Sequence, residues 1–567
     1  MNTMSGTLSK IDPARVRVAN TVRLSNAPRG LAVAAQGVYV AVRSTGRAHR
    51  GGALRVASVS GFDFADPALA YAPDSWALLS ITNDGLVAFR RVGGIAGTEL
   101  VPDLAASLPA PEDAGKTYTF RLRPDIRYST GRLVQPEDFR RAIERVYEVK
   151  PVSGGTQYFG VIVGTDRCKP GRRCDLSRGI VTDRSARTVT FHLTRPDPDF
   201  LTKLALTFAD AVPASTPPHD VGRQRVPATG PYMFDQVTKT RFKLVRKPRF
   251  RPWSVDAKPD GYPDEITLSE LNDPAQVQKA VRSVAAGRAD LALSIVPPLL
   301  KADLQALATR YPGQLRLSTS ATTNFFFLNT RVPPFDDVRV RRAVNDAVDR
   351  QAFASRLGTA FAPTCQIMPP NFPSYRKTCP YAPGGVSGLD AARRLVQASG
   401  RAGQAVTVWG LAPQALQANF MASVLRSLGY RTRLRTIQDV QRYFTLITNP
   451  RTRAQTGYYG WASDFPSEAG FLRPMFTCAA IVSGAGTNPS GFCNHSIDRQ
   501  IDHASAVPAQ DPPAAHALWR RVELELLAQA PMVPTYNRKS VDFVGKRVGN
   551  YQYDPQWGTL LDQLWVR

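Results

Sequence analysis

The cysteines are the residues whose types and spacing most directly predict chemistry. They fall into three close pairs along the chain: Cys168 with Cys174, Cys365 with Cys379, and Cys478 with Cys493. Six cysteines permit many pairings, so the sequence leaves the connectivity open. Neighbour pairing would close only short loops in segments rich in proline and glycine, such as CKPGRRC. We favour disulfides over free buried cysteines, and disulfides indicate an oxidising, extracytoplasmic compartment.

Other chemistry matches the sequence less well. A zinc site is the rival use of the cysteines, but there is no CxxC motif, and the six histidines do not cluster with the cysteines at ligand spacing. The sequence also has no GxSxG elbow, no Walker A motif and no HExxH motif. The glycine-rich stretch Gly93–Gly97 lacks the flanking strand and helix of a phosphate-binding loop. These absences predict a binding protein rather than an enzyme, with no catalytic residues, no cofactor and no metal.

The chain is long and strongly basic. It has 567 residues and a formal net charge of +26, from 72 Lys+Arg against 46 Asp+Glu. The basic residues are scattered, as in KLVRKPRFRP, without a dense block or a recognisable nucleic-acid module. We therefore expect no nucleic-acid partner. We interpret the charge as an arginine-rich solvated surface, with attraction to an anionic cell envelope as the alternative.

The N-terminal segment bears on location. No run approaches the roughly 18–20 apolar residues of a membrane-spanning helix, and MNTMSGTLSKIDPARVRV lacks the pattern of a secretion signal. Gly6–Val42 resembles one blade of the YVTN-type β-propeller repeat, through IDP, NAPRGLAV and VYV. One blade cannot bury its own faces. We therefore hypothesise that Met1 is an internal start and that a signal or anchor lies upstream.

The elements that would position a binding site alternate between strand and helix. Leu54–Ser60 is predicted as a buried strand, and Pro136–Val149 as a helix with its apolar residues on one face. Val338–Arg350 is predicted as a second amphipathic helix. From about Asp273 onward, helices closed by glycine alternate with strands, a pattern typical of open α/β sheets covered by helices. The sequence thus predicts an α/β protein with two lobes and a ligand cleft between them.

Four segments, in order, resemble motifs of the family 5 extracellular solute-binding proteins, which include dipeptide- and oligopeptide-binding components of ABC importers. These segments are Arg123–Arg145, Ala228–Pro252, Asn324–Arg350 and Gly457–Leu472. The resemblance covers nearly the whole chain from about Gly51. It implies a bilobal, periplasmic-binding-protein-like fold of type II, in the large peptide-binding class, whose cleft closes by a hinge.

The resemblance also implies domain boundaries. We expect a β-propeller-like remnant at 1–45, a linker at 46–52, the first part of lobe I at 51–272 with a subdomain at about 76–215, lobe II at 273–533, and a return to lobe I at 534–567.

The resemblance places Asp464, in the GWASD segment, where peptide-binding members hold the acid that pairs with the ligand's α-ammonium. An ammonium group taken out of water needs a counter-charge because a buried unpaired charge is very costly. The alternative is a loop or capping aspartate before a proline-containing turn. In the same segment, Trp461 would line the cleft, as would Trp409 on a predicted strand, with ordinary core packing as the alternative for both.

Other expected ligand contacts come from the first lobe and from a strand. Tyr71 and Trp76 stand where family members place cleft aromatics, and Asn324 and Phe325 open a strand that would offer backbone hydrogen bonds to an extended ligand. The chain departs from dipeptide binders at Ala415, where those proteins carry an arginine that clamps the ligand carboxylate. Another basic residue, a longer peptide or a non-peptide ligand would account for this departure.

Together these features predict a monomeric, extracytoplasmic solute-binding protein that captures a peptide or peptide-like solute and delivers it to the membrane permease of an ABC importer. The alternative is a surface receptor or sensor that binds a non-peptide small molecule without transport.

Overall fold

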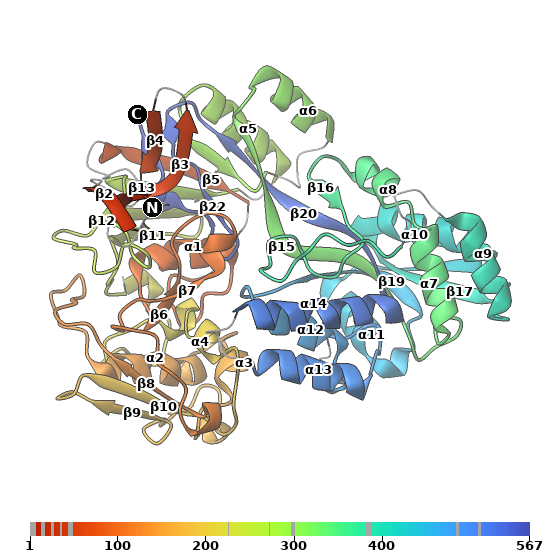
Figure 1. Cartoon of the computed structure of the whole chain (residues 1–567), viewed down its shortest axis with the longest axis horizontal. Coiled ribbons are helices and arrows are strands. Elements are labelled where there is room, and N and C mark those ends of the chain that lie inside the picture. The colour runs from red at the N-terminus through yellow and green to blue at the C-terminus, as the bar shows by residue number, and fades with distance from the viewer. Residues whose placement is uncertain are drawn as a thin grey trace.

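The structure is a computed structural model. It describes residues 49–567 apart from positions 60, 225, 272, 296–300, 382–387, 483–486 and 508–511, together with the backbone of four N-terminal strands. In Figure 1 the chain forms two masses joined by two long strands. We call these masses lobe I and lobe II.

One large mixed sheet extends through both lobes. Its strands lie in this spatial order: β11 (Tyr232–Val237), β12 (Arg241–Arg246), β13 (Glu265–Glu270), β5 (Ala53–Ser58), β14 (Leu291–Leu293), β20 (Met532–Val544), β15 (Leu315–Leu328), β19 (Thr456–Ala462), β17 (Ala405–Leu411) and β18 (Arg431–Ile437). The short strand β16 (Phe361–Pro363) pairs with β20.

The crossing between the lobes is made by β15 and β20, which pair antiparallel (Figure 1). Burial along β20 falls in its middle: Arg538 is exposed and Ser540 half-buried, whereas both ends of the strand are buried. Burial along β15 changes in the same place, from half-buried or exposed residues up to Thr322 to the buried run that ends at Leu328. The pairing register also shifts between Thr319 and Thr323. Because both strands leave one core before entering the next, this stretch has the character of a hinge.

Helices cover each lobe. Those of lobe I are α1 (Pro73–Thr82), α2 (Pro136–Glu148), α3 (Thr156–Phe159), α4 (Phe200–Lys203), α5 (Pro274–Ala285) and α6 (Lys301–Arg310). Those of lobe II are α7 (Val338–Ala347), α8 (Arg350–Leu357), α9 (Leu389–Ala398), α10 (Ala415–Ser427), α11 (Val440–Thr448), α12 (Glu468–Phe476), α13 (His495–Ser505) and α14 (Pro512–Gln529). Small sheets complete lobe I: β8 (Thr117–Arg121) with β10 (Thr188–His192) and β9 (Ile180–Asp183), β6 (Val87–Phe89) with β7 (Leu100–Pro102), β21 (Val548–Gly549) with β24 (Trp565–Val566), and β22 (Tyr553–Asp554) with β23 (Gly558–Thr559).

The predicted helices form, with one change of bounds. The apolar face of α2 is buried as expected: Phe139 and Ile143 are each 1% exposed. The predicted helix Val338–Arg350 divides into α7 and α8, because Asp349 accepts a hydrogen bond from the backbone N–H of Ala352 at 2.8 Å and so caps a new helix. Local capping therefore overrides a continuous hydrophobic stripe.

The predicted domain boundaries stay a prediction, and strand pairing favours a different division. β14 pairs with β5 in parallel, so the chain is still part of lobe I at residues 291–293, beyond the predicted boundary at 272. Crossings along β15 and β20 are therefore favoured over crossings at 272–273 and 533–534. At the N-terminus, β1 (Thr7–Asp12) pairs with β2 (Arg17–Arg23), and β3 (Pro28–Ala34) with β4 (Gly37–Val42), as two separate two-stranded sheets. The predicted linker lies outside the described residues as far as position 48.

Candidate functional site

Asp464 lies just beyond the end of β19, at the boundary between the two lobes. It is half-buried, and the Tyr71 hydroxyl of lobe I donates a hydrogen bond to its carboxylate at 2.8 Å. Burial raises the pKa of Asp464, while hydrogen bonds from Tyr71 and Tyr158 act in the opposite direction. The structure thus brings two of the predicted ligand residues, Asp464 and Tyr71, into direct contact across the lobes.

Further contacts fix the segment around Asp464 against lobe I. The side chain of Gln556 donates to the carbonyl oxygen of Asp464 at 2.8 Å, and the Ser467 hydroxyl donates to Asp199 at 2.6 Å. Phe465 packs into the core of lobe I, with its ring centroid 6.2 Å from that of Tyr158. The segment 464–467 therefore forms an interlobe contact, an arrangement expected of a closed cleft.

Of the predicted tryptophans, one is half-buried near this boundary and two are buried in core contacts. Trp461 is half-buried on β19, and its indole N–H is buried without a hydrogen-bond partner among the described residues. Trp409 is 4% exposed on β17, with the Arg435 guanidinium 4.3 Å from its ring centroid. Trp76 is 7% exposed and donates to the carbonyl of Ala70 at 2.8 Å. Trp409 and Trp76 thus make core contacts.

Strand pairing does not support the predicted backbone contacts of Asn324 and Phe325 with a ligand. At both residues β15 lies between β19 and β20, so strands occupy both of its edges there. Phe325 is 1% exposed inside the core of lobe II. The side chain of Asn324 accepts from the Tyr458 hydroxyl at 2.6 Å. A ligand therefore has no free strand edge at this point.

A cavity of about 520 Å³ lies beside the hinge stretch of β15 and β20. Ser320 and Thr322 of β15 line it, together with residues of α1, β13, β14, β20 and the loop between β22 and β23. Gln556 also lines it, so the cavity adjoins the segment that holds Asp464. None of the seven predicted ligand residues is among the described residues that line the cavity.

Three charged residues of this cavity were missed by the sequence analysis: Asp74, Arg538 and Asp542. Burial raises the pKa of Asp542, and four donors face its carboxylate: the backbone N–H of Ser294 and the hydroxyls of Ser540, Tyr551 and Thr559. Asp74 stands in the same YAPDSW segment as Tyr71 and Trp76, which was a signal for it. Arg538 and Asp542 carried no comparable signal, because only the crossing of the strands brings them to the cavity.

Comparison with known proteins places the chain in a family. Residues 99–483, more than half of its length, match the family model described as bacterial extracellular solute-binding proteins, family 5 middle. The chain belongs to this family. A di/tripeptide-binding protein of Pseudomonas aeruginosa is 23% identical over 83% of this chain and 86% of its own length. The dipeptide-binding protein of Escherichia coli is 24% identical over 81% and 85%.

Solved structures share the fold of this chain. A clavulanic acid biosynthesis oligopeptide-binding protein superimposes with a TM-score of 0.80 at 27% identity, covering 93% of this solute-binding protein and 97% of its own chain. A peptide complex of a periplasmic binding protein from Helicobacter pylori has a TM-score of 0.68 at 19% identity, covering 91% and 98%. The predicted family, the bilobal α/β fold class and the extracytoplasmic location are confirmed. Among the helices of the described residues, none is long and apolar enough to cross a membrane.

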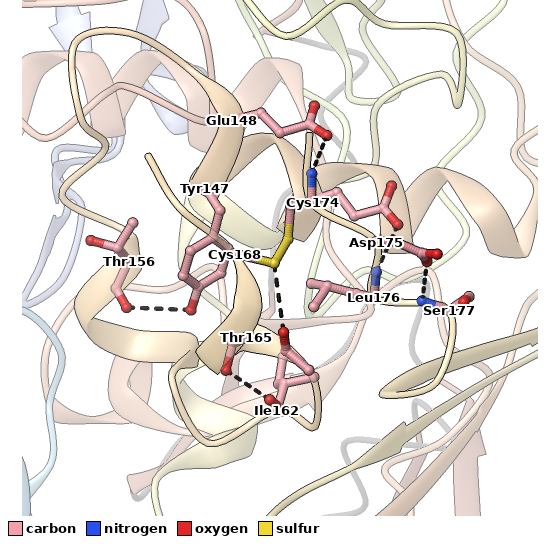
Figure 2. Close-up of a disulfide and its surroundings, with 12 residues drawn as sticks. Tyr147, Glu148, Thr156, Ile162, Thr165, Cys168, Cys174, Asp175, Leu176 and Ser177 are labelled. Carbon is pink, nitrogen blue, oxygen red and sulfur yellow. Dashed lines mark hydrogen bonds between the residues drawn. A yellow bond between two sulfur atoms is a disulfide. The ribbon is translucent and has the colours of Figure 1, made fainter. Parts of the chain in front are cut away.

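The cysteines of this solute-binding protein form the three neighbouring disulfides that the sequence favoured: Cys168–Cys174, Cys365–Cys379 and Cys478–Cys493. Figure 2 shows the first of them, where Glu148 accepts a hydrogen bond from the backbone N–H of Cys174 at 2.9 Å.

The expectation that no histidine clusters with the cysteines is wrong for His495. Its ring nitrogen lies within 4.8 Å of the sulfurs of Cys478 and Cys493. Those sulfurs are bonded to each other, so they are not thiolate ligands in this state.

Proposed function

We propose that this solute-binding protein captures a peptide or peptide-like solute between its lobes and delivers it to the membrane permease of an ABC importer. The observation that carries the proposal is the cavity of about 520 Å³ at the hinge stretch, next to the segment in which Asp464 meets lobe I. A volume of this size is in the range of small-molecule sites. The peptide-binding names of the relatives support a peptide as the solute.

Asp464 is the proposed anchor for the ligand's α-ammonium group. Asp464 is half-buried at the lobe boundary, and the neutral hydroxyls of Tyr71 and Tyr158 donate to its carboxylate. An ammonium group would provide the opposite charge, which a partly desolvated carboxylate favours over a neutral donor. Tyr71 would then contact both the anchor and the ligand. Binding of this kind requires no covalent change in the solute, which supports a non-catalytic role.

The carboxylate end of the ligand has no proposed arginine clamp. Ala415 is exposed at the start of α10, so it contributes no charge. A solute longer than a dipeptide, with its carboxylate held elsewhere or left in solvent, fits this arrangement. Other relatives are named for heme and for deoxycholate, so the ligand has to be identified directly. Native mass spectrometry of the protein purified from its host is expected to show bound peptides, and a single non-peptide mass would contradict the proposal.

Asp464→Asn tests the anchor. The amide keeps the shape of the side chain but removes the counter-charge, so peptide affinity should fall by about 2–5 kcal/mol, the range for breaking a buried charge pair. The measurement is isothermal titration calorimetry with the peptides that copurify. The matched control is Asp390→Asn on α9 of lobe II, whose side chain is 83% exposed and should leave affinity unchanged. An equal peptide affinity in Asp464→Asn and the wild type would contradict the role of Asp464 as the ammonium anchor.

A further inference from the structure

The hinge cavity contains a buried carboxylate oxygen that the described part of the chain leaves unsatisfied. Asp74, in the first turn of α1, is 5% exposed and lines the cavity. Its Oδ2 atom is buried and has no hydrogen-bond partner among the described residues. Asp542 lines the same cavity, but four donors face its carboxylate. Leaving a buried carboxylate oxygen without a partner is costly. Asp74, unlike Asp542, therefore has room for a hydrogen-bond donor from a bound solute.

The charges around Asp74 favour a cation. The pKa of Asp74 is raised to about 7, chiefly by burial and also by the negative charges of Glu270 on β13 and Asp542 on β20. Contacts with Ser58 and Gly61 act in the opposite direction. Arg538 is the one basic residue among the described residues that line the cavity, against the two acids Asp74 and Asp542. An added positive charge would therefore enter a region where negative charge is in excess.

We infer that this cavity receives a cationic group of the bound solute, an ammonium or a guanidinium, and that Asp74 is its counter-charge. The inference rests on the proposed function and narrows the solute class to peptides or peptide-like molecules with a basic group besides the α-ammonium. Asp464 and Asp74 then have separate roles. The first anchors the terminus at the lobe boundary, and the second selects a basic group at the hinge.

The test compares peptides that differ only in one positive charge. Alanine di-, tri- and tetrapeptides that contain either lysine or the uncharged, similarly shaped norleucine are titrated calorimetrically at about pH 8, where Asp74 is mostly ionised and the peptide α-amine is still partly protonated. The wild type is expected to prefer the lysine peptide by about tenfold or more. In Asp74→Asn the preference should fall to about twofold or less. Asp125→Asn, an exposed aspartate in lobe I, removes the same charge outside the cavity and should keep the wild-type preference.

A second measurement stays informative even if Asp74→Asn fails to fold. In the wild type, lowering the pH below about 7 protonates Asp74. The preference for the lysine peptide over the norleucine peptide should therefore decrease. Equal affinities for lysine and norleucine peptides at high pH would overturn the inference while leaving peptide binding intact. A preference that persists in Asp74→Asn, or that does not change with pH, would also overturn it. Failure of every peptide to bind would overturn the proposed function and the inference with it.

Discussion

At the scale of single residues, the contact between Tyr71 and Asp464 joins two positions that are distant in sequence. The Tyr71 hydroxyl donates to Asp464 at 2.8 Å, and the Tyr158 hydroxyl lies 3.3 Å from that of Tyr71. These hydroxyls favour the ionised carboxylate, whereas burial favours the protonated form and is the larger effect. Asp464 must be ionised to bind an ammonium group. The affinity for a peptide should therefore change with pH as Asp464 titrates.

We expect peptide affinity to decrease as the pH falls and Asp464 becomes protonated. Because burial raises the pKa of Asp464, this decrease should occur at a higher pH than for an ordinary aspartate. In Tyr71→Phe one hydrogen bond to the carboxylate is lost, so the pKa of Asp464 should rise further and the loss of affinity should begin at a higher pH. The measurement is peptide affinity against pH by calorimetry. Tyr430→Phe is the matched control, because the buried Tyr430 hydroxyl has no partner among the described residues. An unchanged midpoint in Tyr71→Phe would contradict this coupling.

At the scale of elements, an ion pair fixes helix α2 in lobe I. Arg145 on α2 and Asp66 both have side chains that are 0% exposed, and two hydrogen bonds of 2.8 and 2.7 Å join them. Arg145 also donates to the carbonyls of Pro217 and His219. This network holds α2 against the loop that contains Asp66 and leads to Tyr71. It therefore helps to position Tyr71 at the site.

Asp66→Ala should destabilise the protein by about 3–5 kcal/mol, because it leaves the buried Arg145 guanidinium without its counter-charge. Arg184→Gln is the control: it breaks the exposed pair between Arg184, which follows β9 and is 67% exposed, and Glu137 of α2, and should cost about 0–1 kcal/mol. Chemical denaturation followed by circular dichroism measures both. Similar losses in the two variants would contradict the role given to the buried pair.

At the scale of the whole molecule, the two lobes are joined by β15 and β20, and the residues least buried along β20 lie where the cavity opens. Closure of the lobes around a solute would bring the segment 464–467 onto lobe I, the contact seen in this structure. The hinge and the site are therefore parts of the same region.

We expect the radius of gyration measured by small-angle X-ray scattering to decrease when a peptide is added to ligand-free protein, because ligand contacts favour the closed arrangement of the lobes. The Asp464→Asn variant, at the same peptide concentration, should show a smaller decrease because less of it is bound. A radius of gyration that does not change on addition of a peptide that calorimetry shows to bind would contradict hinge closure.

The sequence by itself determined the class of this protein. Periodic apolar residues placed α2 and its buried face, and short cysteine separations favoured the disulfides that the structure contains. The ordered motifs, among them GWASD around Asp464, indicated the family. Each of these features is local, because its residues lie within one short stretch of the sequence.

Only the tertiary structure decided which residues meet at the site. Pairing on both edges of β15 leaves no free strand edge for the predicted backbone contacts at Asn324 and Phe325. Asp74 of α1 lines the same cavity as Arg538 and Asp542 of β20, although hundreds of residues separate it from them in the chain. Burial and long-range pairing are properties of the assembled fold, and periodicity or motif spacing does not encode them position by position.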